Sequence, residues 1–154
     1  MRTAAFVSRA GGRGEAVHVP HKGQLNYKQL VARGAYYPPT VVCCEDPNSE
    51  IVQVETFGPI MVVQRANDWN HAMQLCNGVR QGLAAALFSG SKKLQEGFLE
   101  DAQAGVLKLN CTTAGADAES PFGGWKASGV GPPEHGASDR EFYTRTQAVY
   151  GHAL

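Results

Sequence analysis

The stretch 54–59 places a carboxylate and an aromatic ring at a break between two apolar runs. The runs on either side are rich in the β-branched and aromatic residues that favour strands. Gly58 tolerates backbone angles that other residues avoid and Pro59 has no backbone donor, so the pair predicts a bend. A bend here could turn Glu55 and Phe57 toward a cleft and make them part of a binding site. The plainer interpretation is a solvated glutamate at a strand end.

The other residues with reactive or metal-binding side chains do not form a recognisable set. The spacing of the four cysteines matches neither a zinc ribbon nor a redox Cys-x-x-Cys pair; they are Cys43, Cys44, Cys76 and Cys111. We expect reduced thiols, three of them in apolar or strand-like stretches where cysteine behaves as a small buried hydrophobe. The five histidines lack the i, i+4 pairing of a helical metal site. No bound metal is expected.

Apolar runs predict the strands that must position these residues. They cover residues 37–43, 60–64, 83–88 and 106–109. Helical patterns lie between the last three runs, and strand–helix–strand units with short connections form right-handed crossovers. The predicted fold class is therefore α/β, a parallel three-layer sheet with flanking helices.

Two helices are expected between these strands. The first is capped by Asp68 or the preceding asparagine and ends at Gly78, and the second is capped by Ser89 or Ser91 and ends at Gly105. The residues with helical spacing on their apolar faces are Trp69, Ala72, Met73 and Cys76 in the first helix and Leu94, Phe98 and Ala102 in the second.

The two ends of the chain give weaker signals. Residues 1–33 are glycine-rich without periodicity and predict a poorly ordered N-terminal arm, with a short helix near 24–31. Residues 34–142 form the expected domain. Residues 143–154 contain an alternating stretch, Thr144 to Tyr150, with nothing after it to protect an edge. We expect this C-terminal oligomerisation strand to pair with another chain.

Charge and composition limit the classes of partner. The 154 residues contain 14 Lys and Arg against 14 Asp and Glu, with no basic block and no acidic tail, so capture of nucleic acid or an anionic membrane is not indicated. No apolar run approaches the ~18–20 residues of a membrane span, and the first residues do not form a signal peptide. We expect a cytoplasmic protein with a neutral or small partner.

The segments that follow the last buried strand are candidates for a pocket wall. Ligands of open parallel sheets bind beyond the carboxyl ends of the strands, and the small polar segment 110–115 leaves the sheet at such an end. A long loop over 120–136 follows, and its aromatic residues favour an ordered, functional loop over a disordered one.

These motifs, in this order, resemble the C-terminal part of the catalytic domain of NAD(P)-dependent aldehyde dehydrogenases, over about residues 34–151. The residues that carry the resemblance are Tyr36-Tyr37-Pro38-Pro39-Thr40, Glu55-Thr56-Phe57-Gly58-Pro59, Gly82-Leu83-Ala84-Ala85, Ala104-Gly105 with Asn110, and Pro121-Phe122-Gly123-Gly124-Trp125-Lys126-Ala127-Ser128-Gly129.

The resemblance implies roles for the site residues. Glu55 would hold the hydroxyls of the nicotinamide ribose of NAD or NADP, since an ionised carboxylate offers only acceptors, and Phe57 would lie beside the nicotinamide ring. Asn110 and Cys111 resemble the wall of the aldehyde tunnel, and Phe122 resembles its aromatic residue.

The departures from the family pattern are equally specific. The family's cysteine nucleophile, glutamate base, oxyanion-binding asparagine and Rossmann-type cofactor domain all lie upstream of the matching region. No cysteine of this chain has the sequence context of that nucleophile, so we assign no catalytic residue. Val54 stands where the family has the first of two glutamates, and Glu134 resembles a second acidic residue near the site.

The resemblance implies NAD(P)-dependent oxidation of a small-molecule aldehyde to a carboxylic acid, with this truncated chain inactive by itself. Two other functional classes stay open. The chain could be a non-catalytic assembly module that forms homo-oligomers or joins full-length aldehyde dehydrogenase subunits, or it could be a decayed gene product that unfolds without cooperativity because apolar surface is uncovered. The sequence distinguishes neither the aldehyde nor NAD from NADP.

Overall fold

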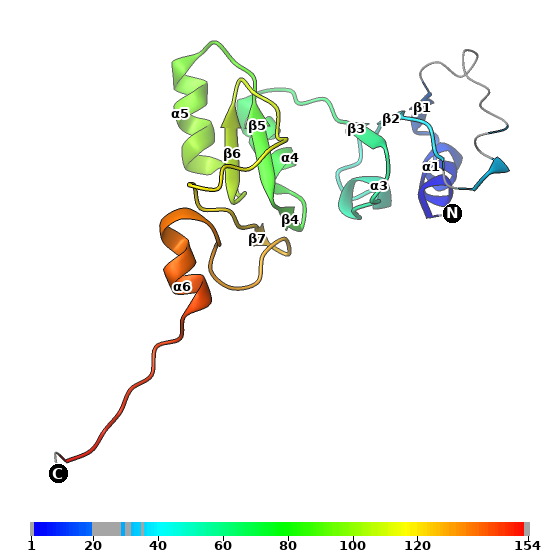
Figure 1. Cartoon of the computed structure of the whole chain (residues 1–154). Helices are drawn as coiled ribbons and strands as arrows, with labels where there is room; N and C mark the ends of the chain where they lie inside the picture. Colours follow the sequence, from blue (N-terminus) through cyan, green and yellow to red (C-terminus); the bar gives the residue numbers. More distant parts are fainter. Residues whose placement is uncertain (1, 20–28, 30–31, 35, 153–154) are drawn as a thin grey trace. The chain divides into compact units, whose positions relative to one another are not determined.

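The computed structural model describes residues 2–19, 29, 32–34 and 36–152. They fall into two compact units, Met1–Val79 and Arg80–Leu154 (Figure 1). Each unit combines helices with short strands, which confirms the predicted mixed α/β class.

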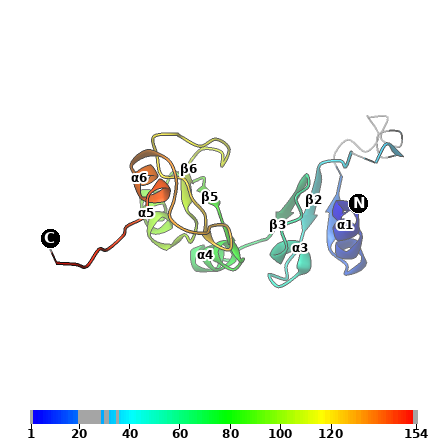
Figure 2. The same ribbon diagram turned by 60° about the horizontal axis from the view of Figure 1, so that its bottom comes forward.

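The N-terminal unit is built on a three-stranded sheet in the order β1–β2–β3. Figure 2 shows β2 and β3 of this sheet with α1 and α3 of the same unit. β2 (Thr40–Cys43) and β3 (Ile60–Val63) run parallel, as expected for these two runs, and β1 (Ala16–His18) is antiparallel to β2. The short helix α3 (Glu50–Gln53) lies between β2 and β3 in the chain and was not predicted.

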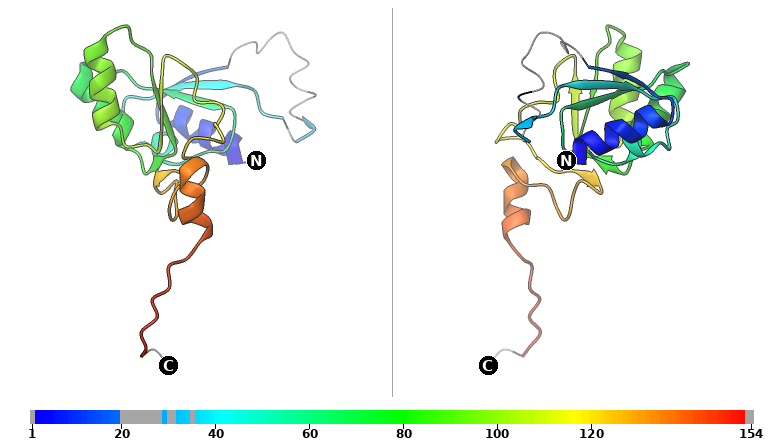
Figure 3. Two further views of the ribbon diagram at one scale, coloured as in Figure 1. Left: turned by 60° about the vertical axis from the view of Figure 1, so that its left-hand side comes forward. Right: turned by 90° about the vertical axis from the view of Figure 1, so that its right-hand side faces the viewer.

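Helix α1 (Arg2–Gly12) occupies the segment that the sequence predicts as a poorly ordered arm, and that prediction is wrong for residues 2–18. The right-hand view of Figure 3 shows this helix beside the strands of its unit. Glycine is tolerated where a helix ends, so Gly11 and Gly12 do not prevent it. Phe6 and Ala10 of α1 form one core cluster with Val42, Cys44 and Ile51. The helix predicted near 24–31 falls almost entirely outside the described residues.

An ion pair joins α1 to α3. The guanidinium of Arg9 donates to both carboxylate oxygens of Glu50, from Nε at 2.7 Å and from Nη2 at 3.0 Å, and lies over the Phe6 ring at 4.7 Å from its centroid. The hydrogen bond from Arg9 lowers the pKa of the Glu50 carboxyl, and Glu50 in turn raises the pKa of Arg9. The pair is partly exposed to solvent, so its contribution to stability is modest and is screened by salt.

This ion pair should make the stability of the N-terminal unit depend on pH. A carboxyl whose pKa is lowered on folding stabilises the fold above its unfolded pKa of about 4.3. That stability is lost as the pH falls through the lower, folded-state value. We therefore expect the wild-type chain to have a higher denaturation midpoint than Glu50→Gln at neutral pH, and the difference to shrink as the pH drops below about 4. Urea denaturation of both proteins across this range measures it, and a difference independent of pH would contradict the prediction.

Helix α4 (Trp69–Asn77) follows the predicted boundaries. The Asp68 side chain accepts a hydrogen bond from the backbone N–H of His71 at 2.8 Å, and the helix ends at Gly78. Met73 is its buried residue, whereas Cys76, predicted on the same apolar face, is exposed.

The C-terminal unit contains one parallel strand–helix–strand crossover. β5 (Ala84–Leu87) and β6 (Val106–Leu109) pair in parallel, and α5 (Lys92–Asp101) connects them. The side chain of Ser91 caps α5, whose Phe98 is buried together with Ala102 just after the helix. The helix ends at Asp101, before the predicted Gly105.

The rest of this unit is loop, with one two-stranded ribbon, a 3₁₀ helix and a short α-helix. β4 (Gln81–Gly82) pairs antiparallel with β7 (Trp125–Lys126), and the 3₁₀ helix η1 (Gly136–Ser138) leads into α6 (Asp139–Tyr143).

One feature differs from the predicted single parallel sheet. Within the described residues, β3 pairs with β2 and β5 pairs with β6, and the strands form separate sheets. Residues 144–152 form no strand within this chain, and the Val149 and Tyr150 side chains are almost fully exposed. The pairing of this segment with another chain stays a prediction. A strand needs a neighbour for its backbone hydrogen bonds, and alternation in the sequence does not supply one.

In the described part of the chain, no helix has the length and apolar character to cross a bilayer.

Candidate functional site

The stretch 55–59 forms a tight turn between α3 and β3. The residue with a left-handed backbone is Phe57, with φ of 51°, and not Gly58 as the composition suggests. The Ile60 N–H donates to the Gly58 carbonyl at 2.8 Å, which closes the turn. This conformation is unfavourable for a residue with a side chain and places the Phe57 ring in solvent, 83% exposed.

The turn is fixed to other elements of the N-terminal unit by backbone groups. The Thr40 N–H of β2 donates to the Pro59 carbonyl at 2.9 Å, and the Arg2 guanidinium of α1 donates to the Glu55 carbonyl at 3.3 Å. The Glu55 side chain itself is exposed, and no donor among the described residues occupies its carboxylate. A carboxylate and a ring are thus both presented to solvent by a fixed turn.

Asn110 joins the carboxyl ends of β5 and β6. Its Oδ1 accepts from the Ser89 N–H at 2.8 Å, its Nδ2 donates to the Ser89 carbonyl at 3.1 Å, and its own N–H donates to the Leu87 carbonyl. The next residue, Cys111, is exposed. The small polar segment therefore begins at the edge of the sheet where the sequence predicts it, with the Asn110 amide engaged by backbone.

Phe122 is held by the segment that contains Glu134. The two residues exchange backbone hydrogen bonds of 2.7 and 2.9 Å, and the Phe122 ring stacks on His135 with centroids 5.6 Å apart. The His135 N–H donates to the Asp139 carboxylate at 2.6 Å. A pocket of about 190 Å³ lies at this loop; side chains in its lining include Leu83, Phe122, Val130, Glu134 and Phe142.

The predicted site residues therefore belong to two units. Glu55 and Phe57 lie in the N-terminal unit, and Asn110, Cys111 and Phe122 lie in the C-terminal unit.

Comparison with known proteins shows which family has these motifs in this order. The model of the aldehyde dehydrogenase family matches residues 3–149. The chain belongs to the aldehyde dehydrogenase family. The match begins in α1, about thirty residues earlier than the sequence motifs alone indicate.

Curated relatives show the same similarity at moderate identity. The chain is 33% identical over 123 residues to the α-ketoglutarate semialdehyde dehydrogenase of Haloferax volcanii, covering 79% of this chain and 26% of that protein. It is 36% identical over 119 residues to aldehyde dehydrogenase [NAD(P)+] 1 of Saccharomyces cerevisiae, covering 77% and 23%. The chain thus spans about a quarter of the length of these relatives.

Part of each of several solved aldehyde dehydrogenase structures has the fold of this chain. A betaine aldehyde dehydrogenase point mutant from Staphylococcus aureus in complex with NAD+ matches with a TM-score of 0.75 and 27% identity, over 90% of this chain and 27% of that one. A lactaldehyde dehydrogenase matches with a TM-score of 0.79 and 25% identity, over 99% and 30%.

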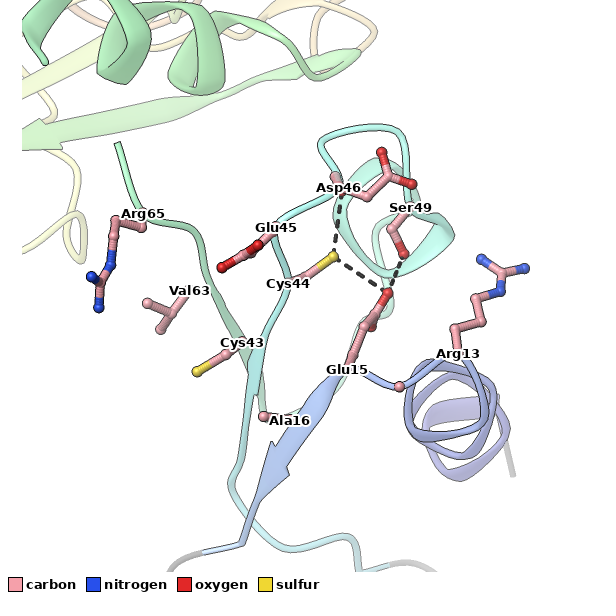
Figure 4. A pocket seen from close by; sticks show the side chains of 11 residues that line it. Arg13, Glu15, Ala16, Cys43, Cys44, Glu45, Asp46, Ser49, Val63 and Arg65 are labelled. Carbon is pink, nitrogen blue, oxygen red and sulfur yellow. Dashed lines mark hydrogen bonds between the residues drawn. The ribbon is translucent and has the colours of Figure 1, made fainter. Parts of the chain in front are cut away.

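A second cavity lies outside the motifs that mark the aldehyde dehydrogenase family, and no motif of the sequence predicts it. It measures about 540 Å³ and lies where β1 begins and where β2 and β3 end (Figure 4). One oxygen of the Glu15 carboxylate accepts from Ser49 Oγ at 2.7 Å and from Cys44 Sγ at 3.3 Å. Glu15 follows a glycine-rich stretch, and nothing in that local sequence predicts that its carboxylate lines a cavity.

The four thiols are free, as expected, but they differ in exposure. Cys44 is buried, and burial raises the pKa of its thiol, which disfavours the nucleophilic thiolate. Cys43 and Cys76 are exposed, so the prediction of buried side chains is wrong for them. Cys43 ends β2 and Cys44 follows it, and the side chains of successive residues in an extended chain point to opposite sides, which separates the two thiols in Figure 4. Among the described residues, no group of three or more His, Cys, Asp or Glu side chains is arranged to hold a metal ion.

Proposed function

We propose that this chain supplies the nicotinamide-ribose contact and part of the aldehyde tunnel of an NAD(P)-dependent enzyme that oxidises an aldehyde to a carboxylic acid. The observation that carries the proposal is the Glu55–Phe57 turn, whose acceptor and ring are exposed and whose sequence is the family's Glu-x-Phe-Gly-Pro motif. Family membership supports it, as do the relative named for NAD(P)+ and the similar enzyme solved with NAD+.

The residues of the turn fit a nicotinamide riboside. The two neighbouring ribose hydroxyls are donors, and the Glu55 carboxylate is an acceptor free to take both. The Phe57 ring offers a flat apolar face for an aromatic ring. When bound, the nicotinamide accepts the hydride that leaves the substrate. In this proposal Glu55 orients the ribose and Phe57 keeps water from one face of the ring.

Phe122 and Cys111 are proposed to line the aldehyde tunnel. The Phe122 ring stacks on His135, and the Phe122 backbone is hydrogen-bonded to that of Glu134, so both parts of the residue have a fixed partner. Asn110 contributes differently, because its side-chain amide is bound to the Ser89 backbone. In this proposal Asn110 stabilises the backbone at the start of the segment 110–115, which forms the tunnel wall.

Binding of NAD+ to the 154-residue polypeptide tests the cofactor role. With contacts to the nicotinamide half alone, we expect a dissociation constant of about 1 mM, which corresponds to about 4 kcal/mol. NMR titration should shift the amide signals of 55–58. Glu55→Gln should weaken binding about tenfold, because a hydrogen bond to a charged group is worth about 1.5–3 kcal/mol. The matched control Glu96→Gln, on the exposed side of α5, should not change it. If the wild type and Glu55→Gln give the same dissociation constant in this titration, the proposal is contradicted.

We further propose that a polypeptide of these residues does not turn over by itself. The family reaction requires a thiolate nucleophile beside the nicotinamide. Cys44 is a buried thiol with a raised pKa, and neither Cys43, Cys76 nor Cys111 has the sequence context of that nucleophile. Incubation with NAD+ and a panel of aldehydes should form no NADH above the blank. Activity that survives replacement of every cysteine by alanine, or any robust turnover, would refute this.

The exposed C-terminal segment favours a second candidate function, a non-catalytic assembly module. Val149 and Tyr150 are 86% and 95% exposed, an unusual surface for large apolar side chains. A module of this kind should co-elute with an intact aldehyde dehydrogenase in size-exclusion chromatography, and removal of residues 144–154 should abolish co-elution. A folded chain that stays monomeric beside that partner excludes the module.

A further inference from the structure

We infer that the first turn of α1 positions the proposed cofactor-binding turn, with Thr3 and Arg2 as positioning residues for Glu55 and Phe57. This inference rests on the proposed function of the 55–58 turn, and it assigns a role to a helix that begins more than fifty residues away in the chain. Neither Thr3 nor Arg2 belongs to the motifs from which the sequence predicts the site.

Thr3 packs directly against Gly58. A methyl group on Gly58 would lie 2.5 Å from Thr3 Oγ1, 2.8 Å from its Cγ2 and 3.2 Å from its Cβ. Gly58 is not in the left-handed region, so its backbone conformation alone would accept alanine. The need for glycine at this position therefore comes from the side chain of Thr3, which occupies the space where a Cβ would lie.

Arg2 holds the other end of the turn. Its Nη2 donates to the Glu55 carbonyl at 3.3 Å, and its guanidinium lies 5.8 Å from the centroid of the Phe6 ring. Phe6 is buried in the core of the unit, so the contact connects the turn to a fixed point. The two contacts from α1 thus bracket Phe57, one on the residue two positions before it and one on the residue after it.

Because Phe57 has a left-handed backbone, the turn depends on these contacts to keep its conformation. A non-glycine residue persists in this region only when its surroundings fix it. If the α1 contacts are lost, the turn can relax, and the Phe57 ring and the Glu55 carboxylate are no longer held in one arrangement. Apparent affinity then falls in proportion to the fraction of molecules that still hold the competent turn.

Two sets of variants test the inference by ¹⁵N relaxation of the 55–58 amides and by NAD+ titration. Arg2→Met removes the donor but keeps the length of the side chain, and Arg13→Met makes the same change just beyond the far end of α1. We expect Arg2→Met to lower the amide order parameters of the turn from about 0.85 toward 0.6, with those of β2 unchanged. It should also weaken NAD+ binding about threefold. Arg13→Met should do neither, and Arg2→Lys, which keeps a donor, should restore part of both.

The second set is a double-mutant cycle on Thr3 and Gly58. Gly58→Ala should weaken NAD+ binding about tenfold or more, because the new methyl group displaces the turn. Thr3→Ala removes the two nearest atoms, so the double variant Thr3→Ala/Gly58→Ala should recover to within about twofold of Thr3→Ala alone. Hydrogen exchange of the β2 amides shows whether each variant keeps the fold. Recovery without loss of global stability is a result that a purely structural role for Thr3 would not give.

The outcomes separate the inference from the proposed function. If wild-type amides in 55–58 do not respond to NAD+, the proposed function fails, while the relaxation data still decide whether α1 orders the turn. The inference is overturned if NAD+ binds through Glu55 but Arg2→Met leaves turn order and affinity unchanged, and Gly58→Ala is equally harmful in the wild-type and Thr3→Ala backgrounds.

Discussion

Replacing Phe6 with alanine should lower the unfolding free energy of the N-terminal unit by about 3–5 kcal/mol, the usual cost of removing a buried aromatic side chain. Phe6 is 7% exposed and packs with Val42, Cys44 and Ile51. The gain in helix propensity from alanine offsets only about 0.5 kcal/mol. Chemical denaturation followed by the fluorescence of Trp69, which belongs to this unit, in a Trp125→Phe background measures the change.

The same substitution at Phe57 is the matched control. Its ring is 83% exposed, so Phe57→Ala should change stability by less than about 0.5 kcal/mol while weakening NAD+ binding. Two results would contradict the expectation for Phe6. A neutral Phe6→Ala would mean that residues 2–12 behave as the loose arm that their composition suggests. A broad transition without cooperativity in the wild-type chain would favour the decayed gene product.

Replacing Gly105 with alanine should destabilise the C-terminal unit by at least about 3 kcal/mol, at the upper end of the cost of overpacking. A Cβ on Gly105 would overlap the carbonyl group of Gly123, which is backbone and cannot turn away as a side chain could. The Gly105 N–H also bonds to the Gly82 carbonyl at 3.0 Å, so the strand cannot shift freely. We expect the 121–129 loop to separate from β6. Trp125 lies in this loop, so its fluorescence during denaturation, in a Trp69→Phe background, measures the loss of stability.

Gly90 provides the comparison in the same unit. No atom lies within 4 Å of a Cβ at this position and its backbone is not left-handed, so Gly90→Ala should be neutral or slightly stabilising. If Gly105→Ala is as mild as Gly90→Ala, the loop does not pack against Gly105 as described.

Local signals predicted the elements of the central region closely. The caps at Asp68 and Ser91 form as expected, because an N-cap depends on residues within one turn of each other. The strand at 106–109 has the predicted bounds, and the parallel pairing of β5 with β6 follows from the short connection through α5.

Long-range packing decided the features that sequence reasoning missed. Residues 2–12 are glycine-rich at one end and lack a cap signal, and their helix is stabilised by burial of Phe6 and Ala10 against residues more than thirty positions away. The cavity that Glu15 lines is likewise formed by segments far apart in the chain, the start of β1 and the end of β2. Residues 144–150 form no strand within this chain, and their pairing with another chain stays a prediction, because alternation specifies a face but not a hydrogen-bonding partner.

The residue types of the candidate site and its resemblance to the family follow from local motifs: Glu-x-Phe-Gly-Pro, an asparagine after a strand and a glycine-rich aromatic loop. How these residues are held depends on contacts between distant segments. Tertiary structure placed the left-handed backbone at Phe57, the Asn110 amide on Ser89 and the Phe122 ring on His135. It also brought Thr3 against Gly58. The physical reason is that a motif records short-range chemistry, whereas the close approach of two segments depends on a core that they share.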